Sequence, residues 1–201
     1  MACSPLLVLF AFFAASSVGV VAVSDGAAPP TPPAVATGGL IASTCNRTLY
    51  YDVCVASLAS RPGSRRADLR GLASISLDVG LDHARATVSL AKALSKRHAA
   101  AAATGGGGAY AAGCLSDCVE EYREAVDGLR KSAAALRRRD YDDVNDLVSG
   151  AMTNSDTCES AFADKPGLRS PLTERNSYFF KICSISIAIT NLLHGSTSRA
   201  L

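Results

Sequence analysis

The sequence predicts an all-α protein built as an antiparallel four-helix bundle. Apolar residues recur at helical spacing in four separate segments, and runs of β-branched residues that favour strands are few. Alanine and leucine are abundant, whereas Phe, Tyr and Trp together make up 6% of the chain, which also favours helix. Four amphipathic helices bury their apolar faces most simply against one another in a single bundle.

The composition sets limits on the class of protein. The chain has 201 residues, of which 48% are hydrophobic, so it can bury the core of one domain. Its 20 Lys and Arg residues nearly balance 18 Asp and Glu residues, giving a formal net charge of +2. A chain of this kind is not fully disordered, and it lacks the broad basic surface of a nucleic-acid binder.

Residues 1–24 are predicted to be a secretory signal peptide. No side chain from Ala2 to Val23 is charged, and an apolar core at residues 6–15 precedes small residues. Cleavage is expected after Ala22 or Ser24, which also removes Cys3. An uncleaved signal anchor is the alternative, but no Lys or Arg flanks the segment. The mature protein is therefore expected to be secreted and to lack a membrane anchor.

The mature chain divides by composition. Residues 25–39 are a spacer rich in Pro, Ala and Gly, and residues 196–201 are a short tail. The folded domain is expected over residues 40–195, with a small cysteine-containing piece at 40–66 before the bundle at 67–195. Within the bundle, residues 98–113 hold five consecutive alanines and then four glycines, which predicts a flexible insertion between two helices.

The four bundle helices are predicted in chain order from their apolar periodicity. The first covers 68–96, with an apolar face at Leu69, Leu72, Val79, Ala86, Leu90 and Ala93. The second covers 114–137, with a single stripe at Leu115, Cys118, Val119, Tyr122, Val126, Leu129, Ala133 and Leu136. The third runs from Tyr141 to Phe162. The fourth is expected to begin with Ser170 as its cap and Pro171 at its first position, and to stop at Gly195.

Export places the six remaining cysteines in an oxidising compartment, where an even number favours disulfides. Six cysteines allow 15 pairings, so the sequence alone does not choose among them. Asn46-Arg47-Thr48 is the only glycosylation sequon in the chain, and Asn46 is predicted to be glycosylated.

No catalytic, cofactor-binding or metal-binding constellation is evident, so the protein is not predicted to be an enzyme. The motifs of serine hydrolases, zinc proteases and phosphate-binding loops are all missing. Cys114 and Cys118 lie one helical turn apart, but structural zinc needs four ligands, Cys158 and Cys183 are single, and export favours disulfides. His83, His98 and His194 are read as packing or helix-terminal residues.

The order and spacing of several short motifs resemble the plant invertase and pectin methylesterase inhibitor family, in particular a branch named for invertase inhibition that includes a pollen allergen. The motifs are Cys45-x8-Cys54, Asp68-Leu-Arg-Gly-Leu-Ala-Ser-Ile-Ser76, Leu115-Ser-Asp-Cys118-Val-Glu-Glu-Tyr122, Ala151-Met-Thr with Thr157-Cys158-Glu159, and Asn176 before the last apolar helix. The resemblance covers about residues 40–195 and implies a four-helix bundle preceded by an N-terminal helical hairpin.

The resemblance also implies two disulfides, Cys45–Cys54 in the hairpin and Cys118–Cys158 between the second and third bundle helices. Closing a loop of about 40 residues is worth roughly 3–4 kcal/mol in the chain-entropy model. Cys114 and Cys183 depart from the family pattern, which needs only four cysteines. They could pair with each other or stay free, and Cys114 could compete with Cys118 for Cys158.

An acidic row on the second bundle helix is the candidate binding interface. Glu120, Glu124 and Asp127 lie opposite the apolar stripe and are expected to be exposed. Periodicity alone also fits a solvated helix face without a partner. In pectinesterase inhibitors, acidic residues at matching positions face the enzyme, as does the Thr before the fourth family cysteine, here Thr157. The position two residues after that cysteine is also acidic in the family, but it is Ser160 in this chain, so one charged contact of the family is not expected here.

The resemblance implies a function in binding rather than catalysis. The predicted protein is a monomeric inhibitor of the apoplast and cell wall that binds pectin methylesterase one-to-one and covers its substrate cleft. The alternative target is cell-wall or vacuolar acid invertase. Invertase inhibitors often carry a Pro-Lys-Phe tripeptide, whereas this chain has only Lys165-Pro166-Gly167, which favours pectin methylesterase. A secreted structural or lipid-carrying helical protein is a more remote alternative, because the cysteine pairs of small plant lipid carriers are missing.

Overall fold

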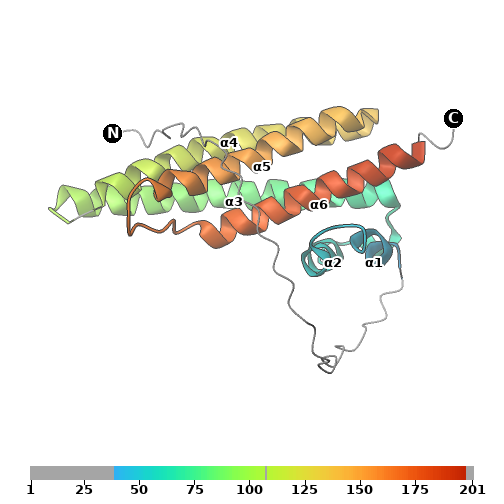
Figure 1. Ribbon diagram of the computed structural model, residues 1–201, viewed down its shortest axis with the longest axis horizontal. Coiled ribbons are helices and arrows are strands. Elements are labelled where there is room, and N and C mark those ends of the chain that lie inside the picture. Colours follow the sequence, from blue (N-terminus) through green and yellow to red (C-terminus); the bar gives the residue numbers. More distant parts are fainter. Residues whose placement is uncertain (1–38, 107, 198–201) are drawn as a thin grey trace, which may run out of the picture.

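The computed structural model describes residues 39–106 and 108–197, and all regular structure in these ranges is helical (Figure 1). The signal peptide predicted at 1–24, nearly all of the 25–39 spacer and residues 198–201 of the tail lie outside the described residues. The elements, in chain order, are α1 (Leu40–Cys45), α2 (Tyr51–Ala59), a 3₁₀ turn η1 (Ser64–Arg66), α3 (Leu69–Ala103), α4 (Ala109–Arg138), α5 (Tyr141–Ala163) and α6 (Thr173–Thr197).

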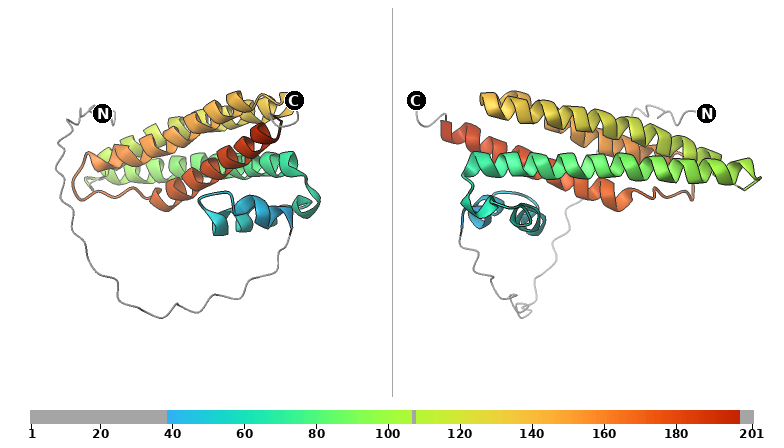
Figure 2. Two further views of the ribbon diagram at one scale, coloured as in Figure 1. Left: turned by 45° about the vertical axis from the view of Figure 1, so that its right-hand side comes forward. Right: turned by 180° about the vertical axis from the view of Figure 1, so that it is seen from behind.

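The four long helices form the predicted antiparallel bundle. Helix α3 packs against α4 and α6, and α5 packs against the same two helices from the other side. Figure 2 shows the four helices side by side along the long axis of the molecule. The fold class expected from the sequence is therefore confirmed.

The starts and ends of the helices follow from local chemistry. The Asp68 carboxylate accepts a hydrogen bond from the Gly71 backbone N–H at 2.7 Å and caps α3. The Asp140 side chain accepts from the Asp143 N–H at 3.3 Å and caps α5. Helix α4 ends at Arg138, and the next residue, Arg139, has a φ of 63° that turns the chain towards α5.

The connection between α3 and α4 is shorter than predicted. Residues 98–113 are not a flexible insertion, because α3 continues to Ala103 and α4 begins at Ala109. Alanine has the highest helix propensity, so the run of five alanines extends the helix. The turn itself depends on Gly105 and Gly108, with φ of 80° and 147°, conformations that favour glycine.

Helix α6 also differs from the prediction at both ends. It begins at Thr173 rather than Pro171, and the Ser170 hydroxyl accepts from the Leu172 N–H at 3.1 Å in the turn just before it. It continues past Gly195 to Thr197, so Gly195 does not end the helix. A glycine inside a helix costs only about 1 kcal/mol relative to alanine, which neighbouring turns can offset.

The core lies between the four long helices and is best predicted on α4. Seven of the eight residues predicted for the α4 stripe are buried, and Ala133 is half-buried. The stripe predicted on α3 is wrong beyond Val79, since Ala86, Leu90 and Ala93 are exposed. The buried residues there are Ala84, Thr87, Ala91 and Leu94. Helix α3 packs against α4 and α6 at once, so its buried face is wider than one narrow stripe.

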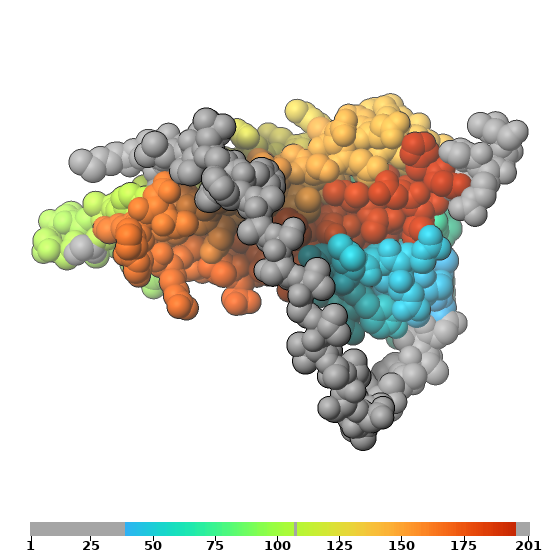
Figure 3. Space-filling model, in the orientation of Figure 1, coloured from blue at the N-terminus to red at the C-terminus, as the bar shows by residue number. Residues whose placement is uncertain are grey.

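The N-terminal hairpin of α1 and α2 lies across the side of the bundle formed by α3 and α6 (Figure 1). The disulfide Cys45–Cys54 joins its two helices, and both cysteines are fully buried. Leu58 of α2 is also fully buried. Figure 3 shows the hairpin packed directly against α6. The hairpin implied by the family resemblance is thus present.

Candidate functional site

Helices α4 and α5 are held in close contact and together present one outer face of the bundle. The disulfide Cys118–Cys158 joins them, with a Cα–Cα distance of 4.7 Å. Farther along, a β-carbon on Gly128 of α4 would lie 3.4 Å from the carbonyl oxygen of Leu147 of α5. The two contacts fix both the spacing and the register of the two helices.

A group of three carboxylates lies on this α4–α5 face. Cys118 marks the direction from α4 towards α5. With about 100° of rotation per residue, three carboxylates lie within about 60° of one another around the α4 axis. They lie on the solvent-facing flank of α4 next to α5, and they are Asp117, Glu121 and Glu124. Burial, and then the charges of Glu124 and Asp117, raise the pKa of Glu121 above its usual value. The charges of Asp117 and Glu124 therefore act on Glu121, and the three residues are called the acidic cluster below.

Thr157 lies on the same face as this acidic cluster. It is half-buried and directly precedes Cys158, which points towards α4. The next residue, Glu159, points the opposite way, since its carboxylate accepts hydrogen bonds from residues of α6. In an antiparallel helix pair this arrangement turns Thr157 outward, on the flank that carries Glu121 and Glu124.

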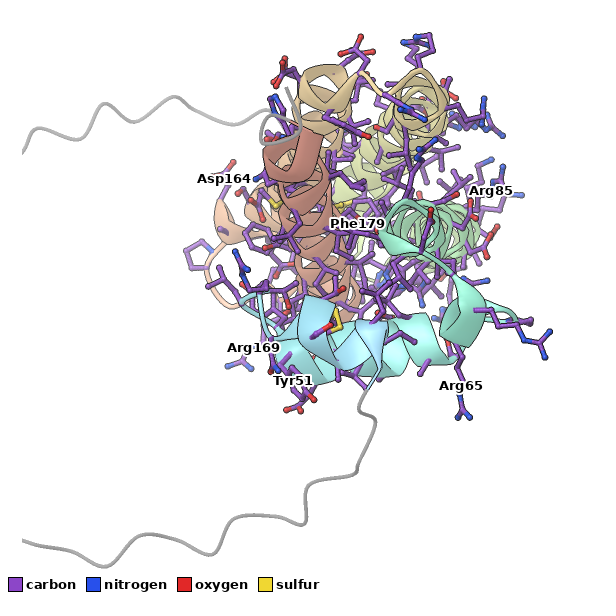
Figure 4. All side chains as sticks on the ribbon, turned by 90° about the vertical axis from the view of Figure 1, so that its right-hand side faces the viewer. Tyr51, Arg65, Arg85, Asp164, Arg169 and Phe179 are labelled. Carbon is purple, nitrogen blue, oxygen red and sulfur yellow. A yellow bond between two sulfur atoms is a disulfide. The ribbon has the colours of Figure 1, made fainter. Side chains whose placement is uncertain are left out.

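Glu120 and Asp127 are exposed as predicted, but their charges are already compensated. Arg123 forms an ion pair with Glu120, and Arg130 forms one with Asp127 at 3.1 Å. Both arginines line a groove of about 290 Å³ between α3 and α4, together with Arg85 and Val88 of α3. Figure 4 shows Arg85 projecting outward from α3.

The structure thus divides the four residues predicted for the interface. It places Glu124 and Thr157 together on the α4–α5 face, and it turns Glu120 and Asp127 towards the arginines on the other flank of α4. Sequence reasoning missed Asp117 and Glu121. Asp117, Glu121 and Glu124 are spaced by four and then three residues, so they share one helix face. This face could have been found from the sequence by taking Cys118, which points to α5, as the reference position instead of the apolar stripe.

A buried polar network lies beneath this face and links three helices. The Tyr122 hydroxyl of α4 donates to Oδ1 of Asn176 of α6 at 2.7 Å. The Asn176 amide donates in turn to Glu159 Oε2 of α5 at 2.6 Å and to Cys158 Sγ at 3.6 Å. Tyr122 is fully buried, and burial raises its pKa, so it stays protonated and acts as a donor. The network fixes α6 relative to the disulfide-linked pair.

The two cysteines outside the family pattern are not paired with each other. Cys183 of α6 is a buried free thiol, and burial raises its pKa. Sγ of Cys114 lies 3.3 Å from the carbonyl oxygen of Ala161 of α5. Cys118 keeps Cys158 as its partner, so Cys114 does not replace it.

The described residues contain no group of three or more His, Cys, Asp or Glu side chains arranged to hold a metal ion. His83 is packed between α3 and α6, where its Nε2 lies 3.0 Å from the carbonyl oxygen of Arg175. Within residues 39–106 and 108–197, no helix is both long enough and apolar enough to cross a bilayer.

Comparisons with known proteins agree with this architecture. The family model for plant invertase/pectin methylesterase inhibitors matches residues 39–189. The chain is 31% identical to a candidate invertase inhibitor of Platanus acerifolia, over 80% of this chain and 88% of that protein. It is 34% identical to pectinesterase inhibitor 28 of Oryza sativa subsp. japonica, over 85% of this chain and 76% of that protein.

A third relative is the cell wall / vacuolar inhibitor of fructosidase 2 of Arabidopsis thaliana, which is 34% identical over 78% of this chain and 84% of that protein. Among solved structures, a mutant form of a pectin methylesterase inhibitor from Arabidopsis superposes with a TM-score of 0.60. It is 22% identical, over 76% of this chain and 96% of that one, and supports the fold alone. Because the family model spans most of the chain, this protein is a member of the plant invertase/pectin methylesterase inhibitor family, whose members are enzyme inhibitors rather than enzymes.

Proposed function

We propose that the protein is a secreted inhibitor that binds pectin methylesterase one-to-one through the α4–α5 face and covers the substrate cleft of the enzyme. Family membership supports the inhibitory role. The observation that carries the choice of surface is the acidic cluster of Asp117, Glu121 and Glu124 beside Thr157. Export to the apoplast, a monomeric state and cleavage of the signal peptide belong to the same proposal.

The acidic cluster has the electrostatics of a surface that gains from a cationic partner. Burial is the main cause of the raised pKa of Glu121, and repulsion from Glu124 and Asp117 adds to it, so the Glu121 carboxylate is destabilised in the free protein. A positive group on the enzyme would relieve that repulsion and gain charge-assisted hydrogen bonds. By contrast, Glu120 and Asp127 would first have to leave Arg123 and Arg130, which reduces what they add to binding.

Invertase is the second candidate target, and one specific observation favours it. Two of the relatives described above are named for inhibition of invertase or fructosidase. The missing Pro-Lys-Phe tripeptide argues in the other direction. A lipid-carrying role has no support in the family membership.

The decisive experiment is an inhibition assay of the oxidised mature protein, residues 25–201, against plant pectin methylesterase and against cell-wall and vacuolar invertase at acidic pH. We expect loss of demethylesterification with both invertases unaffected. Inhibition of invertase alone would overturn the choice of target. Inhibition of neither enzyme by the folded protein would overturn the proposed function.

Two matched double variants test the surface. Glu121→Gln with Glu124→Gln removes two charges from the acidic cluster and should weaken inhibition at least about tenfold, equivalent to about 1.4 kcal/mol. Glu120→Gln with Asp127→Asn removes two charges from the arginine flank and should change inhibition by no more than about threefold. Equal losses in the two double variants, or a larger loss in the second, would contradict the assignment to the α4–α5 face.

A further inference from the structure

We propose that the mature protein carries an N-linked glycan on Asn46 and that this glycan covers the exposed apolar side chains of Leu49 and Tyr51 in the N-terminal hairpin. The sequon Asn46-Arg47-Thr48 follows α1 directly, and Asn46 is the C-cap residue of that helix. The inference concerns the hairpin, which contacts α3 and α6 and lies across the bundle from the α4–α5 face. It is therefore separate from the proposed inhibitory surface.

Asn46 is well placed to carry a large polar group. Its side chain is exposed, and its backbone N–H donates to the Ala42 carbonyl oxygen at 3.0 Å, so the backbone is already satisfied. In the described part of the chain no hydrogen bond uses the Asn46 side-chain amide. The Thr48 hydroxyl donates to the Cys45 carbonyl oxygen at 2.8 Å, which folds the sequon into a compact turn without using the asparagine. A glycan at this point displaces no contact of the fold.

The covalent step is a group transfer in the secretory pathway, so it rests on the export that is part of the proposed function. The oligosaccharide comes from a polyprenyl-diphosphate-linked donor, and a bond forms between its C1 carbon and Nδ2 of Asn46. The bond from C1 to the diphosphate oxygen breaks, the diphosphate leaves with the electron pair, and the amide loses one proton. No oxidant or reductant is needed. The donor is the co-reactant of ordinary N-glycosylation at an Asn-x-Thr sequon.

The hairpin holds three of the four large apolar side chains that stand out as exposed in the described residues. Leu49 is 85% exposed, Leu40 is 44% exposed and Tyr51 is 40% exposed. Figure 4 shows Tyr51 at the outer edge of the hairpin. Leu40 lines a pocket with Leu69 of α3 and Leu192 of α6, whereas Leu49 and Tyr51 lie two residues apart at the start of α2. Exposed apolar side chains such as Leu49 and Tyr51 promote association unless something covers them.

The glycan is attached within reach of these side chains. Leu49 lies three residues from Asn46, at most about 10 Å along an extended chain. Pyranose rings combine apolar C–H faces with a polar rim of hydroxyl groups. They can therefore cover Leu49 and Tyr51 while keeping the outer surface hydrated.

The first test is the mass of the full chain secreted from plant cells, measured before and after treatment with peptide-N-glycosidase. We expect the loss of one glycan from the wild type and no loss from Asn46→Gln or Thr48→Val. Thr48→Ser keeps the sequon and is the matched control that should keep the glycan. A wild-type mass without a glycan would overturn the proposal.

The second test addresses the covering of the apolar surface. Secreted wild type and Asn46→Gln are compared by sedimentation velocity and by binding of a hydrophobic dye, with helical circular dichroism as the check on folding. We expect Asn46→Gln to bind several-fold more dye and to self-associate, and we expect Asn46→Gln combined with Leu49→Ser to reverse both effects. Equal dye binding and equal sedimentation of the glycosylated wild type and folded Asn46→Gln would overturn the covering role. Inhibition of the target enzyme should be the same in all three proteins, which separates this proposal from the proposed function.

Discussion

The hairpin and the bundle each contain one disulfide, but the two links act on very different structures. Helices α1 and α2 have 6 and 9 residues, whereas the bundle helices have between 23 and 35. Isolated helices shorter than about 12–15 residues are marginal in water, so the hairpin depends on its covalent link and on a few buried side chains. The bundle has a continuous core, and its disulfide fixes the register of helices that are already well packed.

Removal of the bundle disulfide should have the largest effect on stability. Cys118→Ala with Cys158→Ala opens a link across 40 residues of sequence, which the chain-entropy model values at about 3–4 kcal/mol. We expect the free energy of unfolding from urea titration to fall by that amount, with native helicity retained. A loss under about 1 kcal/mol would show that core packing alone sets the register.

Removal of the hairpin disulfide should cost less and act locally. Cys45 and Cys54 are separated by 9 residues, and a loop of this size is worth about 2–3 kcal/mol. In Cys45→Ser with Cys54→Ser, we expect amide hydrogen exchange to accelerate in α1 and α2 while α4 stays protected. Acceleration throughout the bundle would mean that the two regions unfold as one unit.

Removal of a single hydroxyl group from the buried polar network should lower the stability of the bundle. Tyr122→Phe removes the donor to Asn176 and leaves the buried amide oxygen without that partner, at a cost of about 1–2 kcal/mol. The matched change in the hairpin is Ser60→Ala, which removes a bond to the Ser57 carbonyl in an exposed turn and should cost under about 0.5 kcal/mol. The comparison fails if the two variants lose equal stability in thermal unfolding.

The smallest predicted effect is a pH dependence that arises between α3 and α6. Burial, and then the charge of Arg175, lower the pKa of His83 from 6.5 to about 4. Between these values the unfolded chain binds a proton that the folded protein does not, so stability should fall as the pH is lowered from about 6.5 to about 4 and change little below that. Because His83 is only half-buried, we expect a loss of about 1 kcal/mol. His83→Gln should remove this slope. Urea titrations across the pH range would measure it, and a slope that persists in His83→Gln would contradict the assignment.

The parts of the structure that the sequence could predict are those determined by local periodicity. The buried stripe of α4 follows from one apolar face. The start of α6 was predicted two residues too early, because Ser170 accepts from the Leu172 N–H in the turn before the helix. The buried face of α3 could not be found in this way, because two neighbouring helices contact it. Arg123 and Arg130 follow Glu120 and Asp127 by three residues in the sequence. The predicted exposure of the two carboxylates did not reveal that these arginines compensate their charges. The link from Tyr122 through Asn176 to Glu159 joins three helices and needed the fold itself.

The buried thiol of Cys183 can report how often the bundle opens. A thiol reacts as its thiolate, and burial both raises the pKa of Cys183 and blocks access to reagents. Alkylation at this residue therefore has to wait for α6 to separate from the core. Its rate, followed by peptide mass spectrometry under native conditions, reports how often the bundle opens.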